Sequence, residues 1–275
     1  MLRFHKIDVF LKPHDTIPLP FIGSTLRGAF GMSLKKVVCI NPTFECEGCF
    51  AKKECVYHDF YEEKNKAHQY RFDFSLNPRF YDFTFYLFEE ATDKLPEILE
   101  AIKMMLTIQG LTYKREKFEI AKVLCNGIDI YHDKSFTLAD VKAQTLKDTQ
   151  EGKNLKLTLK TPLRMKHQGK ILKDKPTLEM LIYSIHNRLK EIQKQPREKL
   201  SFTPQYKEKQ SNIEFIDQTR LSNRQQTKLQ MGGIVGDLIF DDIDDESLRY
   251  LSIGEVIGLG KQTVFGMGNI EVTHI

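Results

Sequence analysis

The sequence predicts an α+β protein built from two tandem ferredoxin-like units, with a cysteine-rich loop after the first helix and a glycine-rich loop near the C-terminus. Three observations predict this class. Segments with strand and helix patterns follow one another in the order β–α–β–β–α–β, and the same order then repeats. A length of 275 residues suits two such units, and 41% hydrophobic residues suffice for two packed cores.

The first unit is predicted from the alternation and periodicity of its apolar residues. Residues 3–12 alternate like a strand, and residues 24–38 have apolar residues on one helical face, with Ser24 as the expected cap. A second helix over 94–108 is expected to stop at Gly110. The remaining strands are predicted at 80–88, at 117–125 and within 57–77. The first domain is therefore expected to span residues 1–148.

The second unit is predicted to follow the linker 148–154 and to form a domain over residues 154–275. Helices are expected at 177–193 and 246–260. Strands are expected at 155–166, 212–223, 232–240 and 268–275.

Four of the five cysteines lie within seventeen residues, which favours a metal site. Cys46 and Cys49 form a C-x-x-C pair, and Cys39 and Cys55 flank it. No run reaches the roughly 18 apolar residues of a membrane helix, and the N-terminus lacks an apolar signal core, so we expect a soluble, cytoplasmic protein without a membrane partner. Disulfides are unlikely in that compartment. A structural zinc ion is the favoured interpretation, with an iron–sulfur cluster or four free thiols as alternatives.

Positive charge is concentrated in the second unit, which favours an anionic partner. Residues 153–228 contain 18 lysine and arginine residues but only 7 aspartate and glutamate residues, while the net charge of the chain is +4. Near the C-terminus, "IGLGKQTVFGMGNIEV" places Gly258, Gly260, Gly266 and Gly268 around Lys261. Closely spaced glycines beside a lysine fit either an anionic ligand lying on the main chain or a tight packing turn.

Several segments together resemble one family. They are "GSTLRGAFGMSLKKVVC" with the cysteine cluster and "CVYHDFYE", then "TPLRMKHQGK", "DQTRLSNRQQTKLQMGGIVGDLIF" and "SIGEVIGLGKQTVFGMGNIEV". The chain resembles the endoribonuclease that processes precursor CRISPR RNA, within the RAMP superfamily. The resemblance implies cleavage of CRISPR repeat RNA by the RNA's own 2′-hydroxyl, without a cofactor in the chemistry, leaving a 5′-hydroxyl and a 2′,3′-cyclic or 3′ phosphate.

The resemblance also suggests site residues. His58 is the first candidate for proton transfer, with Tyr57 and Lys52 as helpers and His167 second. The candidate RNA-binding residues are the four glycines and Lys261, together with Arg27, Lys35, Arg164, Lys166, Lys170, Arg220, Arg224 and Lys228. The last three fall at four-residue spacing and would form one stripe if that stretch were helical after Leu221.

One position departs from the family. Many relatives have a histidine where this chain has Gly258. A non-catalytic RNA-binding RAMP subunit of a CRISPR effector complex is therefore the alternative function. A zinc-stabilised interaction domain unrelated to RNA is a third hypothesis, which leaves the glycine loop and the basic region without a role.

Overall fold

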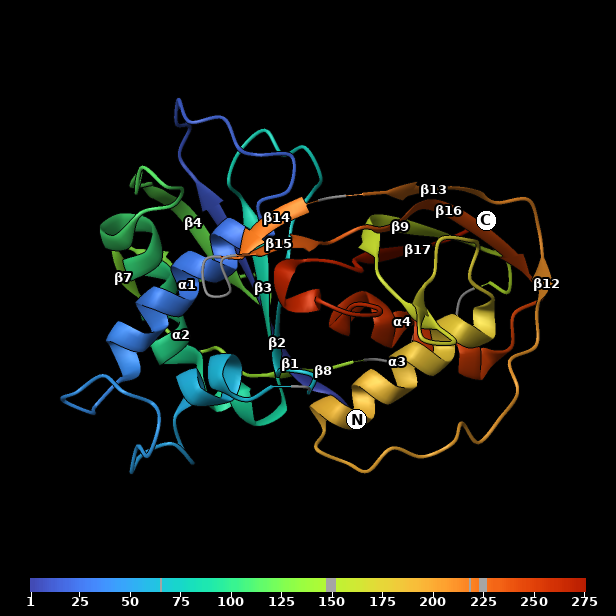
Figure 1. The fold of residues 1–275 in the computed structure, drawn as a ribbon, viewed down its shortest axis with the longest axis horizontal. Coiled ribbons are helices and arrows are strands. Elements are labelled where there is room, and N and C mark those ends of the chain that lie inside the picture. Colours follow the sequence, from blue (N-terminus) through green and yellow to red (C-terminus); the bar gives the residue numbers. More distant parts are fainter. Residues whose placement is uncertain (65, 147–151, 218, 223–226) are drawn as a thin grey trace. The chain divides into compact units, whose positions relative to one another are not determined.

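The computed structural model describes residues 1–64, 66–146, 152–217, 219–222 and 227–275, with the backbone alone described in 219–222 and 227–230. The chain separates into two compact units, Met1–Thr145 and Leu146–Ile275 (Figure 1). Each contains an antiparallel sheet and two main helices.

The N-terminal unit follows the predicted order of elements. Its principal elements are β1 (Arg3–Leu11), α1 (Gly23–Val38), the π-helix η1 (His58–Glu62), β2 (Tyr70–Asp73), β3 (Phe83–Phe88), the 3₁₀ helix η2 (Glu89–Lys94), α2 (Leu95–Met104), the π-helix η3 (Met105–Gln109) and β4 (Ile120–Cys125). Short strands follow at β5 (Ile128–Asp129), β6 (Tyr131–His132), β7 (Ser135–Phe136) and β8 (Gln144–Thr145). The strand order in the sheet is β2-β3-β1-β4-β5, with β8 paired to β1.

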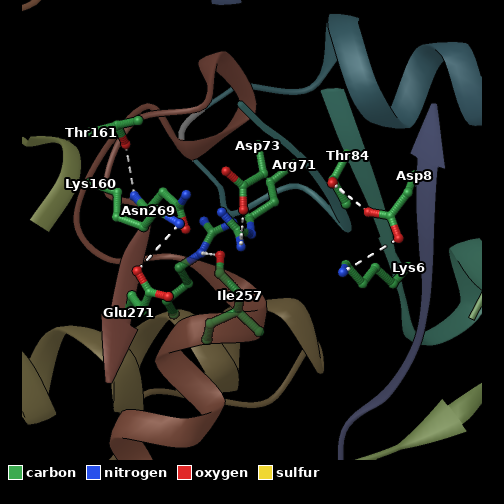
Figure 2. Close-up of polar contacts among 11 residues, drawn as sticks. Lys6, Asp8, Arg71, Asp73, Thr84, Lys160, Thr161, Ile257, Asn269 and Glu271 are labelled. Carbon is green, nitrogen blue, oxygen red and sulfur yellow. Dashed lines mark hydrogen bonds and ion pairs between the residues drawn. The ribbon is translucent and has the colours of Figure 1, made fainter. Parts of the chain in front are cut away.

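An aromatic core joins α1 to this sheet. The ring centroid of Phe30 on α1 lies 4.9 Å from that of Phe85 on β3, and Phe72 on β2 completes the group. All three side chains are fully buried. Near them, Asp8 accepts a 2.6 Å hydrogen bond from the Thr84 hydroxyl (Figure 2). The apolar face predicted for α1 is thus the face that contacts the sheet, while α2 packs beside α1.

The C-terminal unit repeats the pattern. Its elements are β9 (Leu155–Leu163), β10 (Lys166–His167), β11 (Lys170–Ile171), α3 (Leu178–Ile192), β12 (Lys207–Glu208), β13 (Asn212–Ile216), β14 (Thr219–Ser222), β15 (Thr227–Gln230), β16 (Gly233–Asp241), α4 (Asp245–Ile257), the 3₁₀ helix η4 (Thr263–Phe265) and β17 (Ile270–His274). The sheet order is β12-β16-β9-β17, with β13 also paired to β16. Helices α3 and α4 pack against each other.

Two local predictions were wrong. Helix α1 begins at Gly23 and its N-cap is Ile22, so Ser24 lies inside the first turn and is not the cap residue. Beyond Ile216 the chain forms a separate hairpin, in which Arg220 pairs with Leu229 and Leu221 with Lys228. Arg220 and Lys228 are therefore on two strands and not on one helical stripe, because backbone pairing outweighs the local spacing. Arg224 lies outside the described residues.

None of the helices in the described residues combines the length and the apolar character that crossing a bilayer requires.

Candidate functional site

In the N-terminal unit, the three residues first predicted for catalysis line one small pocket. Lys52, Tyr57 and His58 lie around it, together with Glu45 and the four clustered cysteines. The His58 side chain is half-buried, and its Nδ1 lies 3.8 Å from a carboxylate oxygen of Glu63. The fold thus brings the cysteine loop and the candidate proton-transfer residues to the same place.

The helical turn that carries His58 is held by its apolar neighbour. Phe60 is fully buried and stacks on Tyr70 of β2, with ring centroids 4.3 Å apart. Tyr61 packs against α1 at Gly31, where an added Cβ would lie only 2.5 Å from the tyrosine ring. The first contact lies between two fully buried rings and the second is a close approach to α1, so packing fixes the position of the turn that carries His58.

Two basic residues predicted to bind RNA stack on a pair of tyrosines beside this pocket. The Arg27 guanidinium lies 4.5 Å from the centre of the Tyr61 ring, and Lys35 Nζ lies 5.1 Å from that of Tyr57. The two tyrosine rings are themselves stacked, 5.2 Å apart. The Tyr61 hydroxyl also donates a 2.7 Å hydrogen bond to the Arg27 carbonyl, and burial raises the pKa of Tyr61 well above its ordinary value. Tyr61 is therefore a neutral anchor that positions Arg27.

His68 is a partly buried histidine that the sequence analysis did not rank as a candidate. It lies near the same cluster, and its Nδ1 is 3.1 Å from the Asp59 carbonyl oxygen. Burial, with the nearby Arg27 charge as a second cause, lowers the pKa of His68 to about 4. Its ring is consequently neutral at neutral pH. Its place in the sequence, after the cysteine loop and close to His58, was the signal that could have drawn attention to it.

In the C-terminal unit, the glycine-rich loop closes onto the end of β9. Lys261 donates its backbone N–H to the Arg164 carbonyl at 2.8 Å, and the Arg164 guanidinium donates to the Gly232 carbonyl at 2.8 Å. The backbone N–H of Asn269, at the end of the loop, donates to the Thr161 hydroxyl at 2.9 Å (Figure 2). The exposed β10–β11 hairpin, with Lys166, His167 and Lys170, continues directly from Arg164. Five basic candidates of this unit, Arg164, Lys166, His167, Lys170 and Lys261, thus belong to two connected segments.

The fold of the chain itself explains why glycine occupies positions in this loop. Gly268 has a φ of +68°, and a Cβ there would lie 1.8 Å from the Leu259 carbonyl oxygen. Gly258 ends α4 with a φ of 76° and a ψ of 163°, a conformation that is almost confined to glycine. Arg188 of α3 supports this helix end by donating to the Ile257 carbonyl at 2.8 Å. Close packing therefore accounts for Gly268 and backbone conformation for Gly258, and Gly260 and Gly266 also have positive φ.

A histidine on α3 has a structural role. His186 is 5% exposed, with one ring nitrogen 2.9 Å from the Tyr250 hydroxyl and the other 3.1 Å from the Glu198 carbonyl. Since both ring nitrogens have partners, His186 is part of the packing between α3 and its neighbours.

The residues that the structure describes form no ready-made metal site. They contain no group of three or more His, Cys, Asp or Glu side chains arranged to hold a metal ion. All five cysteines have free thiols.

Comparisons with known proteins agree with the segments quoted above. Residues 157–270 match the family of CRISPR-associated endoribonuclease Cas6, and residues 2–145 match a family described as an N-terminal domain. An uncharacterised protein of Archaeoglobus fulgidus is 26% identical, with 92% of each chain covered.

Solved structures show the same fold. A Cas6 product complex superposes with a TM-score of 0.59 at 14% identity, covering 99% of both chains. Thermus thermophilus Cas6 gives 0.58 at 12% identity, covering 99% of this chain and 98% of the other. A Cas6-related protein from Pyrococcus furiosus gives 0.51 at 13% identity, with 99% coverage of both.

Proposed function

Because this chain belongs to the Cas6 family of CRISPR-associated endoribonucleases, we propose that it cleaves CRISPR repeat RNA in a precursor transcript and so releases mature guide RNAs. The match of residues 157–270 to that family carries the proposal. The strand orders β2-β3-β1-β4 and β12-β16-β9-β17 support two ferredoxin-like domains, which we place at residues 1–148 and 154–275.

The proposed reaction is an internal transesterification. The 2′-oxygen of the nucleotide before the cut forms a bond to the adjacent phosphorus, and the bond from that phosphorus to the 5′-oxygen of the next nucleotide breaks. The 2′-hydroxyl proton passes to a base, and the departing 5′-oxygen gains a proton. No metal ion takes part, and the products are a 2′,3′-cyclic phosphate (or the 3′ phosphate from its hydrolysis) and a 5′-hydroxyl.

We assign proton transfer first to His58, because it lines the pocket with Tyr57 and Lys52. Tyr57 is the helper for proton transfer, and the Lys52 ammonium supplies positive charge for the crowded phosphorane. His167, on the exposed hairpin of the other unit, is the second candidate. Gly258 offers no side chain for chemistry, so the histidine that many relatives have there has no counterpart.

RNA binding is assigned to basic residues in both units. Arg27 and Lys35 are already oriented by tyrosine rings, so less side-chain freedom is lost when they contact phosphates. Arg164, Lys166, Lys170 and Lys261 supply charge around the glycine loop. The backbone of Gly258, Gly260, Gly266 and Gly268 shapes that loop, and Arg220, Arg224 and Lys228 add charge along the 219–230 stretch.

The test uses a repeat-containing transcript in EDTA. We expect cleavage at one site in the repeat and none when the nucleotide before the cut carries 2′-deoxyribose, since the attacking oxygen is then missing. Cleavage that persists at the deoxy site would refute the mechanism. Tight binding without any cleavage would instead favour the alternative, a non-catalytic RAMP subunit of a CRISPR effector complex, which the glycine at position 258 supports.

One structural neighbour suggests which partner this protein has. One structural neighbour is a partial Cas6-RT-Cas1–Cas2 complex, which superposes with a TM-score of 0.55 at 11% identity, and this chain covers 46% of that longer chain. We propose a CRISPR effector complex as a partner of this protein.

A further inference from the structure

The cysteine loop, residues 39–55, has no buried residue. Phe44 is 48% exposed and Phe50 is 76% exposed, whereas all four cysteines are half-buried. A loop held by apolar packing would bury its phenylalanines first, since they gain the most from leaving water. This loop instead turns its cysteines inward, which points to a partner for sulfur.

The four cysteines face one small cavity. Cys39, Cys46, Cys49 and Cys55 all line a space of about 20 Å³, which is room for about one water-sized particle. They reach it from three places on the loop: the C-terminal end of α1, the turn at Gly48, and the residues before η1. The turn is closed by a 3.3 Å hydrogen bond from Cys49 N–H to the Cys46 carbonyl, and Gly48 has a φ of +67°.

We propose that these four cysteines bind one zinc ion as a tetrahedral tetrathiolate. Four sulfur ligands leave no open position for a substrate, so the ion is structural. The four thiols lie around the cavity without forming a compact ligand group. The loop between them is held by short turns and by local hydrogen bonds of Asn41 and Thr43, so a metal ion can contract the cavity without unfolding a helix or strand. Lys52 on the cavity wall offsets part of the negative charge of the four thiolates.

The consequence is a clamp between two elements. Cys39 follows the last residue of α1, and the Cys55 carbonyl accepts a 3.1 Å hydrogen bond from Asp59 N–H at the start of η1. Bound zinc would tie the end of α1 to the turn that carries Tyr57 and His58 and would replace the apolar core that the seventeen-residue loop lacks. The site stands independently of RNA cleavage, because a non-catalytic subunit would need the same clamp.

The experiment measures metal content and thiol reactivity on the full chain, purified without a tag. We expect about one zinc per chain by elemental analysis, falling below about 0.1 in the double variant Cys46→Ser/Cys49→Ser. Glu45→Gln, which changes a residue of the same cavity that is not a proposed ligand, should keep its zinc. His58→Ala should also keep it. In the native protein the four thiols should resist a thiol reagent until a strong chelator is added.

Cys125 provides an internal control, since it is buried in β4 and should react only on unfolding, with or without the chelator. Native protein without zinc and with four reactive thiols would overturn the proposal. So would zinc retained by the double variant, iron with acid-labile sulfide in place of zinc, or zinc lost on His58→Ala or Glu45→Gln.

Discussion

The two loops that are conspicuous in the sequence differ in what explains their unusual residues. In the glycine-rich loop of the C-terminal unit, Gly268 lies against the carbonyl of Leu259, and Gly258 ends a helix in a conformation that suits glycine. Close packing at Gly268 and backbone conformation at Gly258 are sufficient reasons within the chain. In the cysteine loop of the N-terminal unit, the cysteines are half-buried while Phe44 and Phe50 remain exposed, and apolar packing does not explain this arrangement. Residues without an internal reason are therefore the better guide to a ligand.

The units also differ in how they present histidine. His58 is half-buried in a pocket with Lys52 and Tyr57, whereas His167 lies on an exposed two-stranded hairpin. Replacing His58 with alanine should slow repeat cleavage by roughly 10²- to 10⁴-fold, the usual contribution of one general acid or base, with binding nearly unchanged. Single-turnover cleavage and a binding titration measure the two quantities.

His167→Ala is the matched variant from the other unit, and we expect it to cut at close to the normal rate. If His167→Ala is slow and His58→Ala is not, the comparison is reversed and the hairpin carries the chemistry. If both variants cut normally, the base is not a histidine.

Gly268 in the glycine-rich loop and Gly48 in the cysteine loop both have positive φ. Replacing each with alanine tests how closely each loop is packed. Gly268→Ala should lower the free energy of unfolding by at least about 3 kcal/mol, because the new Cβ meets backbone at 1.8 Å in the present geometry. At Gly48 no atom lies within 4 Å of an added Cβ. Gly48→Ala should therefore lower the free energy of unfolding by only about 1 kcal/mol, because alanine disfavours the left-handed conformation. Denaturant unfolding of both variants measures the difference, and equal losses would contradict it.

Acid should weaken the N-terminal unit through His68. Its pKa is about 4 in the folded protein and near 6.5 when unfolded, so the unfolded chain binds more protons between these values. Stability therefore falls as the pH drops through this window. The wild type should lose about 2 kcal/mol more than His68→Gln between pH 7.5 and pH 5. His167→Gln, at an exposed position in the other unit, should leave the dependence of stability on pH as it is in the wild type. If His167→Gln changed that dependence and His68→Gln did not, the comparison between the units would fail.

The smallest effect concerns charge in the C-terminal unit. Lys166→Ala/Lys170→Ala removes two exposed charges of the hairpin and should lower the slope of log affinity against log salt by about 1.4 for single-stranded repeat RNA. Lys207→Ala/Lys209→Ala is the control, because these lysines pair with Asp242 and Asp241 at 2.7 Å each. Equal slopes in the two variants would show that the hairpin faces away from RNA.

The sequence by itself determined the order and nature of the main elements. Strands β1, β9 and β17 and helices α1 to α4 lie close to their predicted ranges, since each is specified by the local spacing of apolar residues. The sequence also indicated the family, because each segment that carries the resemblance is a continuous stretch of residues.

Only the tertiary structure decided what depends on contacts between distant residues. The stretch that contains Arg220 and Lys228 forms a hairpin, because the two strands satisfy each other's backbone groups. Gly268 is needed because of a carbonyl nine residues earlier in a folded-back loop, and His68 has a low pKa because of the residues that bury it. The common cavity of four cysteines, His58 and Lys52 likewise arises where the loop returns from α1 to η1. Spacing along the chain encodes which face of an element is apolar, but burial, close approach and charge depend on which elements meet in space.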